Sequence, residues 1–270
     1  MRKYLIFIVT LAVMLGAAAA GAATRLRLAT TTSTENSGLL YVLIPPFEQQ
    51  TGIKVDVISV GTGKALKLGQ RCDVDLVMVH APAREIAYVK KGYGVDRRAV
   101  MHNYFAIAGP PHDPAGVAKA RSLTDALARI ARRKAAFVSR GDDSGTHIKE
   151  RSLWKAAGIK TDWPGYKEAG QGMGAVLNMA SQLGAYTLTD TGTFLKYQTA
   201  GKLKLKLLFM KDKLLANPYH VMMVNPARCP KVKVKAARAF MDFLVSPRGQ
   251  AIIKNYRAAG KQLFWPDVVK

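Results

Sequence analysis

The sequence predicts an α/β protein in which short strands alternate with helices. Apolar and β-branched segments of a few residues recur between longer amphipathic stretches, and Gly, Pro or hydroxyl residues separate them. Of the 270 residues, 49% are hydrophobic and 22% are charged, which is the composition of a folded globular protein and not of a disordered chain. Repeated β-α units of this kind lead us to expect a mostly parallel sheet.

The expected strands are short apolar or β-branched runs that end at turns. They cover residues 25–29, 54–60, 75–80, 103–109, 135–139, 185–189, 202–210 and 220–224. The run at 202–210 alternates Lys with Leu, which is typical of an edge strand.

The expected helices lie between these strands, at residues 38–50, 61–68, 84–91, 122–134, 145–157, 174–183 and 234–256. Pro45 and Pro46 are expected to interrupt the first helix and Gly52 to end it. Ser122 is expected to cap the fourth, because its side chain can accept a hydrogen bond from an amide of the first turn.

Residues 1–22 predict a secretory signal that is removed from the mature protein. Arg2 and Lys3 give a positive start, an apolar run covers 5–15, and 16–23 contain only Gly and Ala. Cleavage is expected after Ala22. Because a membrane anchor needs about 20 apolar residues with different flanks, we expect export to the periplasm without an anchor.

The charge balance favours an anionic partner. Lys and Arg total 41 against 18 acidic residues, a formal net charge of +23, which suits nucleic acid, a membrane surface or small anions. Export argues against nucleic acid. Cys72 and Cys229 are too few for a disulfide scaffold and match no zinc motif; the periplasm permits a bond between them, but the sequence does not demand one.

Three turns between a strand and a helix are rich in small hydroxyl residues or Gly. They are residues 30–34 (TTTST), 60–63 (VGTG) and 139–147 (SRGDDSGTH). Helix N-termini offer unpaired amides and a partial positive charge, hydroxyls add neutral donors, and Gly lets the backbone come close. Together these features predict a site for a small desolvated oxyanion. Ser and Thr are also ordinary helix caps, so any one turn alone would be weak evidence.

Other local patterns do not support a catalytic or nucleotide site. Gly63-Lys64 lacks the first Gly and the final Ser or Thr of a P-loop, and the Gly-rich segment 170–174 follows no apolar strand. No spacing indicates a catalytic metal. His147 either helps to orient the third turn or lies on a helix surface. The remaining histidines show no partner in the sequence, and core or surface positions are expected for them: His80, His102, His112 and His220.

Several longer motifs resemble periplasmic tungstate-binding proteins of ABC uptake systems. The resemblance runs in order from about residue 28 to the C-terminus. It is carried most specifically by 28–40 (LATTTSTENSGLL) and 139–150 (SRGDDSGTHIKE), and further by 60–63, 79–82 (VHAP), 92–95 (GYGV), 170–174 (GQGMG), 185–190 (AYTLTD) and 217–219 (NPY).

The resemblance implies the type II periplasmic binding protein fold, in which two α/β domains close on the ligand around two crossing strands. Residues 103–108 and 220–224 are the expected hinge strands. Domain I would then comprise 23–104 and 222–270, and domain II 105–221. The first two turns fall in one domain and the third in the other, so a bound oxyanion would join the domains.

The resemblance also implies binding without chemistry, with tungstate as ligand, no cofactor, and a membrane permease as partner of a monomeric protein. The expected ligand donors are Thr31, Thr32, Thr62, Arg140, Ser144 and Thr146, with Arg140 supplying a charge-assisted contact. Asp142 and Asp143 would repel the ligand, so we expect them to cap the helix or to hold Arg140.

Three alternatives stay open. The first is a binding protein for molybdate or another tetrahedral oxyanion. The second is a hydrolase with Ser144 as nucleophile, which would need a His partner. The third is an exported basic protein that binds nucleic acid or anionic lipid through charge alone, with salt-sensitive affinity and no dominant residue.

Overall fold

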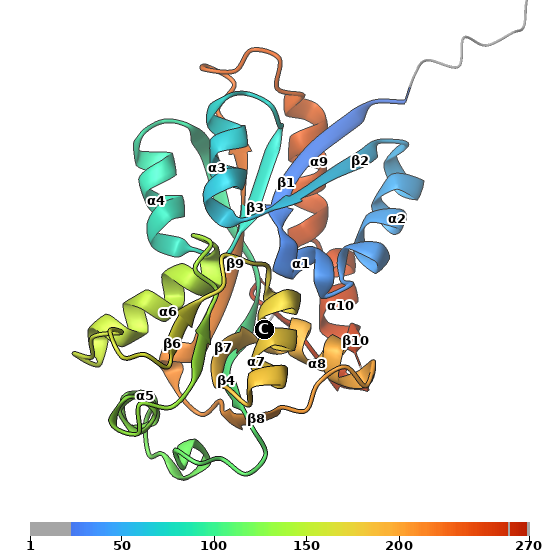
Figure 1. Ribbon diagram of the computed structural model, residues 1–270. Helices are drawn as coiled ribbons and strands as arrows, with labels where there is room; N and C mark the ends of the chain where they lie inside the picture. The colour runs from blue at the N-terminus through green and yellow to red at the C-terminus, as the bar shows by residue number, and fades with distance from the viewer. Residues whose placement is uncertain (1–22, 259, 269–270) are drawn as a thin grey trace, which may run out of the picture.

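The computed structural model describes residues 23–258 and 260–268, which form two lobes (Figure 1). The expected signal segment, 1–22, lies outside the described residues. Lobe I, drawn at the top of the figure, contains the start of the chain and its C-terminal part. Lobe II, drawn below it, contains the middle of the chain.

Lobe I is built on a mixed sheet with the strand order β2-β1-β3-β9-β4-β12. β1 pairs in parallel with β2 and β3, whereas β9 is antiparallel to both β3 and β4. The strands are β1 (Arg25–Thr31), β2 (Lys54–Val60), β3 (Leu76–Val79), β4 (Gly94–Gly109), β9 (Ala216–Val224) and the short β12 (Trp265–Pro266).

Six helices cover this sheet: α1 (Thr32–Asn36), α2 (Leu40–Thr51), α3 (Thr62–Gln70), α4 (Pro82–Lys90), α9 (Val234–Val245) and α10 (Pro247–Asn255). The expected interruption of the helix at Pro45 and Pro46 is wrong, because both residues lie inside α2. Gly52 ends that helix in the left-handed conformation, as predicted. The expected single helix at 234–256 is divided, because Ser246 has extended backbone and caps α10.

Lobe II is built around the second half of β4. The strands β7 (Thr187–Asp190) and β8 (Lys206–Phe209) pair antiparallel with it, and β5 (Phe137–Ser139) pairs in parallel with β6 (Tyr166–Glu168) and bridges to Tyr186 beside β7. The helices are α5 (Leu123–Arg132), α6 (Gly145–Ala156), α7 (Met173–Leu183) and α8 (Thr191–Thr199). Ser122 caps α5 as predicted. β6 and α8 were not predicted.

The remaining elements are short. Two 3₁₀ turns cover Val117–Lys119 and Lys213–Leu215, and β10 (Arg257–Ala258) pairs with β11 (Lys261–Gln262). Among the described residues, no helix combines the length and the hydropathy that crossing a bilayer requires.

Two crossing strands connect the lobes. β4 runs through both, and β9 returns beside it, so the sheet is mixed and not mostly parallel as expected. The buried apolar residues separate accordingly: one cluster draws on residues 26–101 and 219–264 together with Leu195, and two clusters draw on residues 105–215. The expected domain boundaries at Tyr104 and Met222 stay a prediction.

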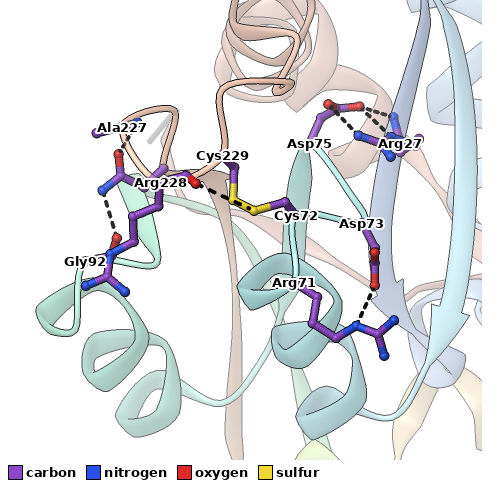
Figure 2. The surroundings of a disulfide bond; sticks show 10 residues. Arg27, Arg71, Cys72, Asp73, Asp75, Gly92, Ala227, Arg228 and Cys229 are labelled. Carbon is purple, nitrogen blue, oxygen red and sulfur yellow. Dashed lines mark hydrogen bonds and ion pairs between the residues drawn. A yellow bond between two sulfur atoms is a disulfide. The ribbon is translucent and has the colours of Figure 1, made fainter.

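A disulfide joins Cys72 and Cys229 within lobe I (Figure 2). Cys72 follows α3, and Cys229 lies in the loop between β9 and α9. The two cysteines are 157 positions apart in sequence, and the whole of lobe II lies between them. Nearby, the buried Asp75 accepts a hydrogen bond from the Arg27 amide at 2.8 Å.

Candidate functional site

The first hydroxyl-rich turn forms the start of α1. Thr31 ends β1 and caps the helix, and its Oγ1 lies 2.8 Å from Thr34 Oγ1 and 3.2 Å from His80 Nε2. Thr32 is the first residue of α1 and is half-buried. This turn is therefore held by hydroxyl contacts at the end of a buried strand.

The second turn starts α3 and meets the third turn across the two lobes. Gly61 caps α3 without a side chain, and Thr62, its first residue, is fully buried. A Cβ added to Gly145, the first residue of α6, would lie 3.1 Å from Thr62 Oγ1 and 2.6 Å from His80 Cε1. Only glycine fits there, and its absent side chain lets the N-termini of α3 and α6 face each other.

The third turn is organised by its own acidic and hydroxyl side chains. Ser144 caps α6 by accepting the His147 amide at 3.2 Å, and Asp142 accepts the Ser144 amide at 3.2 Å. His147 Nδ1 accepts the Asp143 amide at 3.1 Å, so His147 orients the turn. Thr146 is fully buried.

Arg140 is the central charged group of the site. Its side chain is 1% exposed and donates from Nη2 to Asp142, as expected for an acid that holds the arginine. Its Nε and Nη1 have no hydrogen-bond partner among the described residues. The hydroxyls of Thr62 and Thr146 are likewise buried without a partner there. These unpaired donors come from both lobes, and a buried cation with free N–H groups is costly unless an acceptor joins it.

His80 has partners that the sequence did not reveal. Its Nδ1 lies 3.0 Å from Asn217 Oδ1, and its ring stacks on Tyr219 with 4.7 Å between the ring centroids. Burial lowers the pKa of His80 to about 4, and the positive charge of Arg140 acts in the same direction. His80 is therefore a neutral, buried support for the turn at Thr31. His102 and His220 also have partners, Asp267 and Glu85.

The N-terminus of α8 was missed as part of this region. Asp190 ends β7 and caps α8 through the Thr193 amide at 2.8 Å. Burial raises the pKa of Asp190, which the positive charge of Arg140 partly opposes, and a Cβ on Gly192 would lie 3.5 Å from Ser37 Cβ in lobe I. The segment 187–193 (TLTDTGT) repeats the pattern of a strand followed by a hydroxyl-rich turn, which could have revealed it.

Asp143 faces the other lobe. It binds Arg84 of α4 through two hydrogen bonds of 2.5 and 2.6 Å. A pocket of about 490 Å³ opens beside this ion pair. Its lining includes Lys64, Lys67 and Arg71. The basic lining places positive charge beside the junction of the second and third turns.

The arrangement of donors suits anion binding, and two observations on the described residues bear on the alternatives of a metal site and of a serine nucleophile. The described residues contain no group of three or more His, Cys, Asp or Glu that could hold a metal ion. In the described part of the chain, the Ser144 hydroxyl has no imidazole or carboxylate bonded to it, because its contact is with the His147 amide. A serine nucleophile would need such a base.

Two lobes joined by crossing strands, with buried donors facing one another between them, define a solute-binding protein. The model of the PBP superfamily domain matches residues 17–248, and the chain belongs to this superfamily of solute-binding proteins, not to a family of enzymes.

Within the superfamily, the chain belongs to the family that includes the tungstate-binding protein TupA of Peptoclostridium acidaminophilum. The two are 41% identical over 247 residues, which is 90% of this chain and 86% of that protein. Two solved structures are also similar. One, described as the tungstate ABC transporter from Geobacter sulfurreducens, is 52% identical, with a TM-score of 0.81 over 86% of this chain and 98% of that one. TupA from Desulfovibrio alaskensis is 48% identical, with a TM-score of 0.78 over 91% and 99% of the two chains.

Proposed function

We propose that this protein binds tungstate between its lobes and delivers it to the permease of an ABC transporter. The observation that carries the proposal is the buried side chain of Arg140, two of whose nitrogen atoms lack partners among the described residues. Asp142 balances its charge but occupies only Nη2. The similar proteins named above as tungstate-binding support tungstate as the oxyanion.

Tungstate fits the donor chemistry of this region, because it is a dianion that only accepts hydrogen bonds at neutral pH. Arg140 supplies a charge-assisted contact, and the hydroxyls of Thr62 and Thr146 are free to donate. Ser144 accepts an amide hydrogen through Oγ and keeps its own hydroxyl hydrogen, whereas the Thr31 hydroxyl faces Nε2 of the neutral His80 and Thr34 Oγ1 and would have to turn from them to donate to the anion. Together with Thr32, these residues form the proposed ligand set.

Selection among oxyanions would follow from the size of the closed site. Sulfate and phosphate are smaller than tungstate, so they would leave some donors unpaired. Molybdate is close to tungstate in size and shape. A carrier of both ions is therefore the second candidate, because hydrogen-bond donors at fixed positions would fit two ions of nearly equal size equally well.

The cellular setting is part of the same proposal. The protein would be exported to the periplasm after cleavage behind Ala22 and would act as a monomer without a cofactor. Residues 23–104 with 222–270, and residues 105–221, would move as the two domains. A bound anion contacts both, so it would stabilise the closed form.

Calorimetry of the mature protein against tungstate, molybdate, sulfate and phosphate tests the proposal, with Arg140→Ala as the variant. We expect one tungstate per chain and a Kd at least about 30-fold higher in the variant, because truncating one partner of a buried charged pair costs about 2–5 kcal/mol. Equal affinity for molybdate would make the protein a dual carrier. Failure of all four anions to bind would refute the proposal.

The same titration at two salt concentrations separates a specific site from binding through net charge. A charge-driven binder loses affinity steeply with salt and depends on no single residue. A desolvated site is screened much less. We therefore expect the affinity for tungstate to change little between about 50 and about 300 mM salt.

A further inference from the structure

Asp190 is a buried carboxyl that the ligand set above does not use. It is 1% exposed and lies at the end of β7, opposite Phe105 of β4. Its Oδ1 accepts the Thr193 amide at 2.8 Å. Its Oδ2 has no hydrogen-bond partner among the described residues, and the same holds for the Thr193 hydroxyl.

The charged group that acts on Asp190 is Arg140. Burial and the charge of Asp190 both raise the pKa of the Tyr219 phenol on β9. The elements packed on β7 and α8 carry further titratable side chains: Glu35 on α1, Asp96, Arg97, Arg98, His102 and Tyr104 on β4, His147, Lys149, Glu150, Arg151 and Lys155 on α6, and Arg257 on β10. His80, stacked on Tyr219, is neutral because burial lowers its pKa to about 4. Arg140 therefore binds the carboxylate of Asp142 and acts electrostatically on that of Asp190.

This charge count becomes unfavourable when a dianion enters. Arg140 contributes one positive charge, whereas Asp142, Asp190 and the anion would contribute four negative charges if both acids were ionised. Asp142 already binds Arg140 and the Ser144 amide, so its charge is compensated. Asp190 has no such second contact at Oδ2. In a desolvated site, neighbouring like charges cannot all stay ionised, so one of the groups binds a proton.

We propose that Asp190 takes up one proton when the dianion binds and donates a hydrogen bond from Oδ2 to the bound anion. This inference rests on the proposed oxyanion site. The proton comes from solvent, one O–H bond forms at Oδ2, and no other covalent bond changes. Asp190 would then be a specificity-determining residue, because its protonated form selects an anion that brings no proton of its own.

The environment of the side chain supports this assignment. Burial raises the pKa of Asp190, and the opposing effects of the Thr193 amide and of Arg140 do not cancel it. In an open form, solvent would reach the carboxyl and keep it ionised at neutral pH. Closure around the ligand would then couple anion binding to proton uptake, and affinity would fall as pH rises.

The test is calorimetry of tungstate binding in buffers with different ionisation enthalpies, at pH values of about 7.0 to 8.5. We expect close to one proton taken up per anion and a Kd that rises up to tenfold per pH unit. Asp190→Asn keeps an oxygen to cap α8 and an N–H to donate, so we expect it to bind with no proton uptake and little dependence on pH.

Glu150→Gln is the matched control, because it neutralises another buried carboxyl of lobe II whose pKa is raised to about 7. We expect this variant to keep the proton uptake. Uptake near zero in the wild-type protein would overturn the inference while leaving the proposed function intact. Uptake that persists in Asp190→Asn, or that disappears in Glu150→Gln, would also overturn it. Failure of the wild-type protein to bind any oxyanion would instead refute the proposed function.

Discussion

Arg84 and Asp143 form an ion pair that joins the two lobes. Nη1 and Nη2 of Arg84, on α4 of lobe I, lie 2.6 and 2.5 Å from the two carboxylate oxygens of Asp143, on the third turn of lobe II. A Cβ on Gly63 would lie 2.8 Å from Asp143 Oδ2, so the second turn packs against the same pair. The pKa of Asp143 is lowered chiefly by Arg84, which means that the contact favours the ionised acid.

We expect Arg84→Met to accelerate release of the bound anion. The pair is partly exposed, and such pairs contribute about 0.2–1 kcal/mol, so the dissociation rate should rise roughly 1.4- to 5-fold. Stopped-flow measurement of anion release would check this. Arg98→Met is the control. It removes the same positive charge, but Arg98 pairs with Asp96 and Asp242 inside lobe I. An equal effect of both variants would mean that net charge, not the contact between lobes, sets the rate.

The two free hydroxyls of the site give a second prediction. Thr62→Val and Thr146→Val keep the shape of each side chain but remove a buried donor that has no partner among the described residues. Each should raise the Kd for tungstate about 13- to 160-fold, since a hydrogen bond to a charged group contributes about 1.5–3 kcal/mol. Thr187→Val is the control, because that hydroxyl donates to the Val138 carbonyl at 2.7 Å. Comparable losses of affinity in all three variants would contradict the proposed donor set.

Glu150 gives a prediction about pH and folding. Burial raises its pKa to about 7, although Tyr166 donates a hydrogen bond to it at 2.6 Å. The folded protein therefore keeps this proton up to a higher pH than the unfolded chain does. Its contribution to stability is complete below the unfolded pKa near 4.5 and is lost as pH rises through about 7.

Glu150→Gln should therefore be more stable than the wild-type protein at about pH 8 and lose that advantage near pH 5. Urea unfolding at the two pH values measures the difference. The gain at high pH should reach at most about 3–4 kcal/mol, because the pKa rises from 4.5 to about 7 on folding and each unit corresponds to about 1.4 kcal/mol. A variant that is less stable at both pH values would show that the carboxyl of Glu150 makes contacts, whatever its charge, that the amide of Gln cannot replace.

The disulfide gives a prediction about stability without an effect on binding. Cys72→Ser with Cys229→Ser opens a covalent loop that spans 157 positions, so the unfolded chain gains freedom. We expect unfolding to become easier by about 2–4 kcal/mol and the melting temperature to fall by roughly 5–15 °C. Dithiothreitol should destabilise the wild-type protein similarly and leave the double variant unchanged. Loss of tungstate affinity in the folded double variant would contradict a purely structural role.

Local sequence rules predicted the elements whose ends carry strong local signals. Ser122 caps α5 through its own hydroxyl, α6 begins at Gly145, and Gly52 ends α2 with a positive φ, all as predicted, but the cap of α6 is Ser144 and not Asp142 or Asp143. Local chemistry is sufficient to define such ends. The hydroxyl-rich turns were recognisable for the same reason; Thr62, Arg140 and Thr146 are each buried with a donor that lacks a partner among the described residues, and their role in ligand binding stays a prediction.

Other features depend on contacts between distant segments. β6 has three partly exposed residues and exists because Phe137 and its neighbours pair with it. β4 extends far beyond the predicted 103–109 because β9 pairs along its first half. Arg84 and Asp143 lie 59 positions apart, and no local pattern connects them. α8 was missed because Thr-Gly-Thr is a poor helix start and its cap, Asp190, comes from the preceding strand.

The bond between Cys72 and Cys229 also gives the chain the connectivity of a ring with two tails. All of lobe II belongs to the ring, and the described parts of both tails belong to lobe I. A single proteolytic cut anywhere between these cysteines would open the ring without separating any fragment, so the nicked protein would keep its full mass until it is reduced. Damage to the exposed loops of lobe II would therefore leave both halves of lobe I covalently attached.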